Sequence, residues 1–185
     1  MKTDYSNKGL VRQCQKGNRK AMKQLYESHS TYLFGVCRRY MKDRMLAEEM
    51  LSDAFLKIFD KLAQLDDASK LRPWMKTLTI RTCLDELKKQ RLQYVDLDEH
   101  RISEMIEVQA EEVEDCSAQE IKKHLEQLPE GYRTVFNLSI IEGFTHKEIA
   151  EMLSITEGTS KSQLSKSKRQ IKSSIEDSRR TQPVF

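Results

Sequence analysis

Apolar side chains recur at steps of three and four residues through the N-terminal half, which is the period of an amphipathic helix. One such helix carries on a single face Met22, Leu25, Tyr26, His29, Leu33, Val36, Cys37 and Tyr40. The pattern predicts a second long helix from about Ala47 to Leu62 and a third from about Pro73 to Arg91, where proline is acceptable in the first turn. A short helix around Leu10 to Cys14, interrupted at Gly17-Asn18, precedes them.

The C-terminal half repeats this helical pattern on a smaller scale. Its predicted core consists of Leu125, Leu128, Phe136, Ile140, Ile149, Leu153, Leu164 and Ile171. Gly and Pro number only 6 and 3 in 185 residues, too few for the turns of an all-β fold. We therefore predict an all-α chain of two small four-helix domains, residues 1–92 and 118–178, with a linker at 93–117 and a tail at 179–185.

The stretch from Thr145 to Ile175 has the pattern of two helices joined by a tight turn. Thr145 followed by Glu148 has the form of a capping box, and Thr156 offers a second N-cap. Only the turn Leu153-Ser154-Ile155 separates the two helices, so the second must cross the first, which is helix-turn-helix geometry. A helix presented in this way, with basic and small polar residues outward, can enter a DNA major groove. An ordinary helical hairpin with a solvated basic face is the alternative.

Charge changes sign along the chain although its formal net value is only +3. From Asp96 to Asp115 there are nine acidic residues and one basic residue, Arg101, and the segments on either side are locally basic. We expect this acidic segment to be a flexible linker that repels DNA. A second role, occupying basic channels when nucleic acid is absent, is supported by its charge alone.

Several functional classes find no support in the residues. The N-terminus has no signal-type apolar core and no segment approaches the roughly 18 apolar residues of a membrane span, so we expect a cytoplasmic protein without membrane insertion. The four cysteines, Cys14, Cys37, Cys83 and Cys116, are too widely spaced for a structural zinc site, and no metal is predicted. No phosphate loop and no paired nucleophile and base stand out, so neither an enzyme nor a cofactor is predicted.

Two polar helix faces in the N-terminal half are candidates for binding. Opposite the apolar face of the second long helix stand Glu48, Glu49, Ser52, Asp53 and Leu56. Acidic residues in a first helical turn would account for Glu48 and Glu49 through the helix dipole, whereas Asp53 and an exposed Leu56 favour a partner surface. The third long helix is strongly basic and follows a polar loop, AQLDDASKLRP, a coupling that favours function over simple solvation.

Three sets of motifs follow one another in a familiar order. They are Ala47–Phe55; Leu71–Leu78 with Asp85–Lys89; and Leu128–Phe136 with Glu148–Leu153 and Glu157–Thr159. Together they resemble the extracytoplasmic-function class of bacterial sigma factors, the two-domain promoter-specificity subunits of RNA polymerase. Within that family the first set resembles the clamp-binding helix, the second the promoter-melting helix and the third the upstream-element reader. The resemblance runs from about Leu10 to Ile175. It implies a sigma region 2 domain followed by a sigma region 4 helix-turn-helix domain.

The resemblance also implies partners and residue roles in the first domain. The face of Glu48, Glu49, Ser52, Asp53 and Leu56 would dock on the clamp of the largest subunit of core RNA polymerase. The flap of the second-largest subunit is a further implied partner, and the resemblance allows an anti-sigma factor. The loop Asp66–Arg72 would hold a base flipped out of the downstream promoter element. The implied downstream-element contacts are Lys70, Arg72, Lys76, Thr77, Arg81 and Lys88.

In the second domain the resemblance implies contacts to the upstream promoter element. The residues implied to contact bases are Lys161, Ser162, Gln163, Ser165 and Lys166, and Thr159 is a further implied contact. The residues implied to hold phosphates are Arg133, Lys147 and Lys168. Three positions depart from the family pattern. Ser154 stands where glycine is usual, and a left-handed serine costs on the order of 1 kcal/mol. Ser160 stands in place of a small apolar residue, and Arg81 in place of asparagine.

We therefore expect a non-enzymatic transcription initiation factor that binds core polymerase, recognises a two-part promoter and promotes strand opening. Two other hypotheses stay open. A stand-alone helix-turn-helix regulator would bind a palindrome as a dimer, and a monomer in solution would weigh against it. A helical adaptor without nucleic-acid function would be hard to reconcile with strongly salt-dependent DNA binding.

Overall fold

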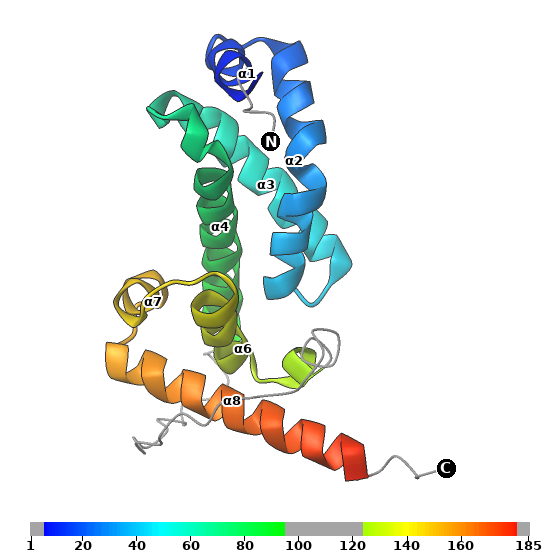
Figure 1. Cartoon of the computed structure of the whole chain (residues 1–185), viewed down its shortest axis with the longest axis vertical. Helices are drawn as coiled ribbons and strands as arrows, with labels where there is room; N and C mark the ends of the chain where they lie inside the picture. The colour runs from blue at the N-terminus through cyan, green and yellow to red at the C-terminus, as the bar shows by residue number, and fades with distance from the viewer. Residues whose placement is uncertain (1–5, 95–123, 181–185) are drawn as a thin grey trace. The chain divides into compact units, whose positions relative to one another are not determined.

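All regular structure in the described residues of the computed structural model is helical, which confirms the all-α prediction (Figure 1). The structure describes residues 6–94 and 124–180. The chain divides into two compact units, unit 1 and unit 2, which part between Asp98 and Glu99. Most of the predicted linker at 93–117 and tail at 179–185 lies outside the described residues, so the predicted domain boundaries stay predictions.

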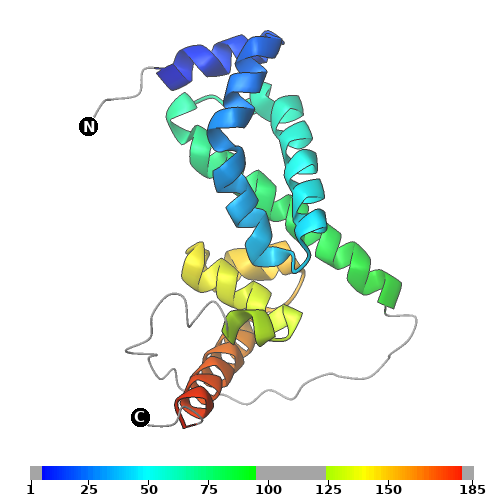
Figure 2. The same cartoon turned by 90° about the vertical axis from the view of Figure 1, so that its right-hand side faces the viewer.

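The described part of unit 1, residues 6–94, contains four α-helices. They are α1 (Ser6–Gln15), α2 (Arg19–Tyr40), α3 (Arg44–Lys61) and α4 (Leu71–Tyr94), with two short 3-10 turns, η1 (Leu62–Gln64) and η2 (Ala68–Lys70), between α3 and α4. Helices α2, α3 and α4 pack against one another in every pairing, and α1 packs on α2 and on both 3-10 turns (Figure 2). The apolar stripes of the helices therefore face a common core.

Side-chain caps fix two helix starts in unit 1. Asn18 caps α2 and Asp43 caps α3, each by accepting a hydrogen bond from a backbone N–H of the first turn. Because α3 begins at Arg44, earlier than expected, Glu48 and Glu49 lie in its second turn. The helix dipole, which acts on the first turn, does not account for these two carboxylates.

The core of unit 1 is apolar. Its completely enclosed side chains include Leu25, Leu33, Val36, Cys37, Ala47, Ala54, Ile58, Met75, Ile80 and Cys83. Two buried hydroxyls, Thr79 and Thr82, donate to the backbone carbonyls of Met75 and Leu78 at 2.9 and 3.0 Å, which satisfies them within α4. Of the face predicted for α2, Tyr26 is 41% exposed and lies at the edge of the core.

Unit 2 is built around one long helix. Its described elements are the helical residues 124–127, α6 (Glu130–Phe136), the π-helical turn η3 (Asn137–Ile141), α7 (His146–Leu153) and α8 (Glu157–Arg180). Helix α8 packs on both α6 and α7. The core between them comprises Leu125, Leu128, Phe136, Ile171 and Ile175, with Tyr132 and Leu164 packed against it. Ile149 of α7 is also buried, whereas Leu153 is only half-buried.

The π-helical turn overturns one predicted core position. Ile140 is 50% exposed, whereas Leu138, which was not predicted to be in the core, is completely buried. A π-helical turn holds an extra residue, so residues after Phe136 are rotated away from the positions that a constant α-helical period assigns them. Gly143, with a φ of 80°, follows the turn in the left-handed conformation that favours glycine.

Candidate nucleic-acid and partner interfaces

Side-chain caps begin both helices of the helix-turn-helix in unit 2. Thr145 Oγ1 accepts from the Glu148 N–H at 3.3 Å while Glu148 Oε2 accepts from the Thr145 N–H at 2.8 Å, which confirms the predicted capping box. The hydrogen bonds from Thr145 hold the pKa of the Glu148 carboxyl below its ordinary value. Thr156 Oγ1 accepts from the Thr159 N–H at 3.0 Å and caps α8 as predicted.

The turn between α7 and α8 contains a left-handed residue. Ser154 has φ 56° and ψ 44°, the conformation for which glycine is favoured, and its N–H donates to the Ala150 carbonyl. The reversal is complete within three residues, because α7 ends at Leu153 and α8 begins at Glu157. In Figure 1, α7 is seen nearly end-on where α8 runs across the view, so the two helices cross steeply. This arrangement is that of a helix-turn-helix.

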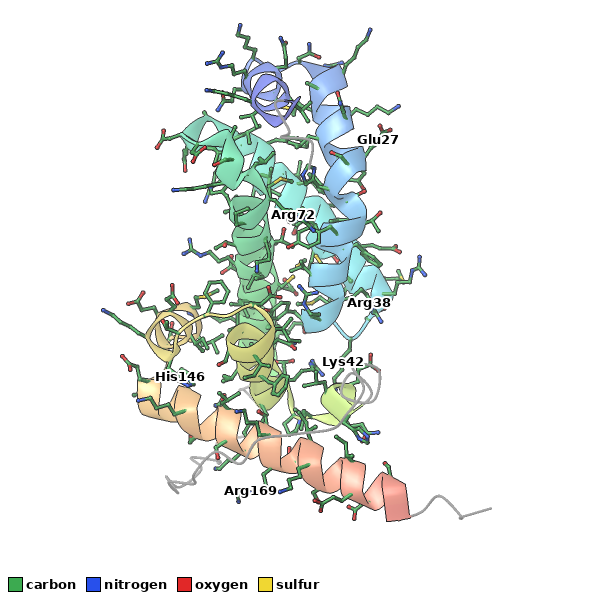
Figure 3. The ribbon with its side chains drawn as sticks, in the orientation of Figure 1. Glu27, Arg38, Lys42, Arg72, His146 and Arg169 are labelled. Carbon is green, nitrogen blue, oxygen red and sulfur yellow. The ribbon has the colours of Figure 1, made fainter. Side chains whose placement is uncertain are left out.

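A polar contact joins the two helices of this motif. His146 Nδ1 lies 2.9 Å from the Oγ of Ser160, a residue with no exposed surface (Figure 3). The contact gives the buried Ser160 hydroxyl a hydrogen-bond partner. A small apolar residue at position 160 would need no such partner. Desolvation lowers the pKa of His146 below its ordinary value; Lys161 adds to this effect and Glu157 opposes it.

Helix α8 turns one face inward and the opposite face to solvent. Its buried residues form a single stripe of Ser160, Ser167, Ile171 and Ile175. The predicted upstream-element residues on α8 lie beside or opposite this stripe: Lys161 is exposed, and Thr159, Ser162, Gln163, Ser165, Lys166 and Lys168 are half-buried. Lys147 is exposed in the first turn of α7. The motif thus gathers basic and hydroxyl side chains from both of its helices.

Three of these polar side chains already have contacts within unit 2. The Gln163 amide lies against the start of α6, because a Cβ added to Gly131 would be 3.6 Å from Gln163 Oε1. Thr159 Oγ1 lies 2.9 Å from Thr156 Oγ1, and Ser162 Oγ donates to the Thr159 carbonyl at 3.0 Å. A base contact by Thr159 or Ser162 requires an exchange of hydrogen bonds, and one by Gln163 requires its amide to leave the start of α6.

Arg133, predicted as a phosphate contact, is buried in the structure. It is 5% exposed in α6, and its Nη1 is buried without a hydrogen-bond partner among the described residues. Burial lowers the pKa of its guanidinium, an effect that Glu130 and Glu126 oppose. The prediction of an open phosphate-binding cation is therefore not supported at this residue, because the packing of α6 on α8 encloses it.

Arg169 is a surface cation that the sequence reasoning left without a role. It is exposed on α8, and Figure 3 shows it projecting from the side of the helix turned away from α6. It lies four residues after Ser165 and seven after Ser162, which places all three on one helical face. That spacing is visible in the sequence and would have assigned Arg169 to the recognition face.

The loop before α4 is held by its own side chains. Asp67 caps η2 by accepting from the Ser69 N–H at 2.9 Å. Hydrogen bonds from Ser69 are the main cause that lowers the pKa of Asp67, and the charges of Lys70 and Lys8 add to it. At the end of the loop the Arg72 guanidinium lies over the Tyr32 ring, 4.2 Å from its centroid (Figure 3).

The predicted downstream-element residues do not share one face of α4. Arg72 and Lys76 are four residues apart and form one row, whereas Thr77, Arg81 and Lys88 form a second row on another side of the helix. Lys70 precedes α4, in η2. Arg72, Arg81, Lys70 and Lys88 are exposed, and Lys76 and Thr77 are half-buried. The first row adjoins the loop and the second continues along the helix.

The predicted partner surface is an outward face of α3. Glu48, Glu49, Ser52 and Leu56 are exposed, Leu56 to 68%, and Asp53 is half-buried. Met45, which is 77% exposed, extends the same face by steps of four, three and four residues through Glu49 and Ser52 to Leu56. The sequence reasoning missed Met45 because it began the helix at Ala47. Apolar side chains at both ends of an acidic stripe are typical of a docking surface.

Other chemistry is not apparent in the described part of the chain. No group of His, Cys, Asp and Glu residues there could hold a metal ion, and no helix there is long and apolar enough to cross a bilayer. Cys14, Cys37 and Cys83 are buried free thiols. The three surfaces described above are therefore the features on which a function can be argued.

Comparisons with protein families match both units. Residues 25–93 match the family described as Sigma-70 region 2, and residues 118–171 match Sigma-70, region 4; together the matches take in more than half of the chain. The RNA polymerase sigma-H factor of Pseudomonas aeruginosa is 21% identical over 187 residues, 95% of this chain and 97% of that protein. The ECF RNA polymerase sigma factor SigW of Bacillus subtilis is 22% identical over 181 residues, with 92% and 97% covered.

Solved structures share the fold. One is the sigma factor RpoE in complex with the anti-sigma factor NepR from Bartonella quintana, with a TM-score of 0.53 and 20% identity over 85% of this chain and 98% of that one. Another is CnrH in complex with the cytosolic domain of CnrY, with a TM-score of 0.50 and 17% identity over 92% and 97%. Helix α1 lies before residue 25, outside the match to region 2.

Proposed function

The chain belongs to the extracytoplasmic-function class of the sigma-70 family, and on that basis we propose that it binds core RNA polymerase in the cytoplasm, directs it to two-part promoters and promotes strand opening. Family membership supports promoter recognition by a non-enzymatic factor. The observation that carries the rest is the presence in one chain of a capped helix-turn-helix, a basic helix with a structured loop, and an acidic and apolar docking face.

In this proposal, α8 enters the major groove of the upstream element. Its outward face, with Ser162, Ser165 and Arg169, would meet base edges, and Lys161 and Lys166 would add charge beside it. Lys147 and Lys168 would hold phosphates on either side. The steep crossing of α7 and α8 supports this role, because α7 can then rest on the backbone while α8 lies in the groove.

The loop Asp66–Arg72 and α4 would hold the downstream element during opening. A flipped base costs a few kcal/mol of unstacking, which capture in the loop would offset. The Arg72 guanidinium is stacked on Tyr32 on one side and exposed, so it is suited to a backbone or base contact. Lys76 would act beside it, and the second row of Thr77, Arg81 and Lys88 would follow the separated strand.

Two surfaces would bind core polymerase. The face from Met45 to Leu56, with Glu48, Glu49, Ser52 and Asp53 between its apolar ends, would dock on the clamp of the largest subunit. The exposed pair Ile140 and Ile141 on the π-helical turn, 50% and 45% exposed, would meet the flap of the second-largest subunit. An anti-sigma factor is a further proposed partner, since a structural relative was solved with one. No observation favours a stand-alone dimeric regulator.

Run-off transcription with core polymerase on a promoter library tests the proposal. We expect start sites that depend on this chain, and sequencing their transcripts gives the promoter code. Potassium permanganate footprinting at those starts tests strand opening separately from binding. The absence of both a stimulated start and binding to core enzyme would rule the proposal out.

One variant that reverses a charge and one that introduces a charge test the docking face. Asp53→Arg and Leu56→Glu should each weaken binding to core polymerase about tenfold or more, as expected of residues that carry much of the binding energy of an interface. Glu27→Arg is the matched control, because Glu27 is an exposed carboxylate on α2 rather than α3 (Figure 3). Leu56 is 68% exposed, so its variant should keep the folded structure even where Asp53→Arg does not. Equal core binding by all three variants and the unmodified chain would remove α3 from the interface.

A further inference from the structure

The start of the described chain is strongly cationic. From Ser6 to Tyr26 there are six basic residues and no acidic one, in a chain whose Lys plus Arg and Asp plus Glu number 32 and 29. The six are Lys8, Arg12, Lys16, Arg19, Lys20 and Lys23, and all are exposed. A helix whose charges served only solubility would be expected to carry both signs, as most of this chain does. A single-sign surface attracts a polyanion.

Three of these cations form a row along α1 and the turn that follows it: Lys8 and Arg12 lie on the helix, and Lys16 is the first residue after its end at Gln15. Lys8, Arg12 and Lys16 follow one another at steps of four residues, while Val11 and Cys14 are buried on the opposite side. At 1.5 Å per residue the row is about 12 Å long, enough to face several phosphates of one strand. None of the three is in an ion pair with another described residue, whereas Lys23 is paired with Glu27 at 3.7 Å.

The row is anchored beside the loop that precedes α4. Gln15 Nε2 donates to the Leu62 carbonyl at 3.0 Å across 47 residues of chain, and α1 packs on both 3-10 turns. Lys8 is close enough to Asp67 to act on its carboxylate. Helix α1 is therefore packed against the two 3-10 turns, of which η2 lies within the segment Asp66–Arg72, and Lys8 at the start of the row acts on Asp67 of that segment.

We propose that the row of Lys8, Arg12 and Lys16 binds the phosphate backbone of promoter DNA next to the loop Asp66–Arg72. The inference rests on the proposed function, because it takes the loop to be in contact with promoter DNA. Phosphate contacts set the register of a protein on DNA without selecting its sequence. The row thus holds the strand that enters or leaves the loop, and it adds affinity to every promoter that the factor uses.

The chain offers a closely matched pair of variants for the test. Arg12→Gln/Lys16→Gln removes two cations four residues apart on the proposed row. Arg38→Gln/Lys42→Gln removes an arginine in the last turn of α2 and a lysine two residues beyond its end, with the same spacing and about 33 Å from the start of that 22-residue helix (Figure 3). All four residues are exposed, and circular dichroism should show unchanged helix content in both variants.

The measurement is equilibrium binding of reconstituted holoenzyme to a forked promoter over a series of KCl concentrations. Two lost phosphate contacts should reduce the slope of log K against log salt by about 1.4 on single strands and about 1.8 on duplex. The Arg38→Gln/Lys42→Gln control should leave the slope unchanged. Promoters with single methylphosphonate linkages then locate the contacts: a neutral linkage opposite the row should weaken the unmodified holoenzyme and not the Arg12→Gln/Lys16→Gln variant.

Three results would overturn the inference. In the first, both variants show the same slope of log K against log salt as the unmodified protein. In the second, both variants lower that slope equally, which would indicate an effect of net charge rather than of a site. The Arg12→Gln/Lys16→Gln variant could instead bind core polymerase more weakly at an unchanged DNA slope, which would assign the row to an acidic protein surface. The proposed function fails by a different result: an unmodified holoenzyme that produces no promoter-specific transcript.

Discussion

Ser154→Gly should stabilise unit 2. Ser154 is the one residue other than glycine with a positive φ in the described chain, and the left-handed conformation costs a residue with a Cβ about 1 to 2 kcal/mol. Glycine does not have this cost, but it lowers the free energy of unfolding by about 0.4 to 1 kcal/mol because it gives the unfolded chain more conformational freedom. The serine side chain is exposed, so little is lost with it. We expect a net gain of about 0.5 to 1 kcal/mol, or about 2 to 8 °C in Tm for a unit of this size.

Two optical signals separate the units in the full chain. Trp74 is the single tryptophan and lies on α4, so its fluorescence follows unit 1, while far-UV circular dichroism follows both. Ser154→Gly should raise the transition of unit 2 and leave the Trp74 transition in place. Ser154→Ala is the control, since it removes the hydroxyl and keeps the left-handed strain. If alanine stabilises as much as glycine, or glycine lowers the Tm, backbone strain at this turn is not the cause.

Three further predictions concern unit 2. His146→Phe should cost about 1 to 3 kcal/mol by leaving the buried Ser160 hydroxyl unpaired, and Ser160→Ala should recover most of that loss in the double variant, measured by thermal unfolding. Because the pKa of His146 is lowered in the folded state, the stability that neutral His146 contributes should be fully present above about pH 6.5 and be lost as pH falls through the folded pKa. His146→Gln should flatten this dependence of the free energy of unfolding on pH. Arg133→Met should leave the salt slope of upstream-element binding unchanged, whereas Lys168→Gln should reduce it by about 0.9.

Local features were the most predictable from the sequence. The caps at Thr145 and Thr156 and the left-handed turn at Ser154 depend on a few adjacent residues, so their chemistry is visible without the rest of the fold. The burial of Arg133 was not predictable from the sequence, because it depends on how α6 packs on α8. Met45 was missed because the predicted start of α3 came later than its cap at Asp43, and helix ends are the least certain part of a pattern.

The binding surfaces were predictable as residue types and less so as geometry. The pattern identified the basic character of α4, but it did not show that Arg72 and Lys76 occupy a different row from Arg81. It also could not show that Tyr32, on α2, supports Arg72, because that contact joins residues forty positions apart. The cations of α1 were visible in the sequence, yet only their packing against the loop gives them a location.

The π-helical turn at Asn137–Ile141 also bears on how this chain can change in length. Because the turn accommodates one residue more than an α-helical turn, deleting a single residue there would leave a continuous α-helix rather than a broken one. Substitution cannot achieve this, since it leaves the number of residues between Phe136 and Gly143 unchanged. One-residue deletions should therefore be tolerated at this turn more readily than elsewhere in the helix, and they would reorient Ile140 without altering its identity.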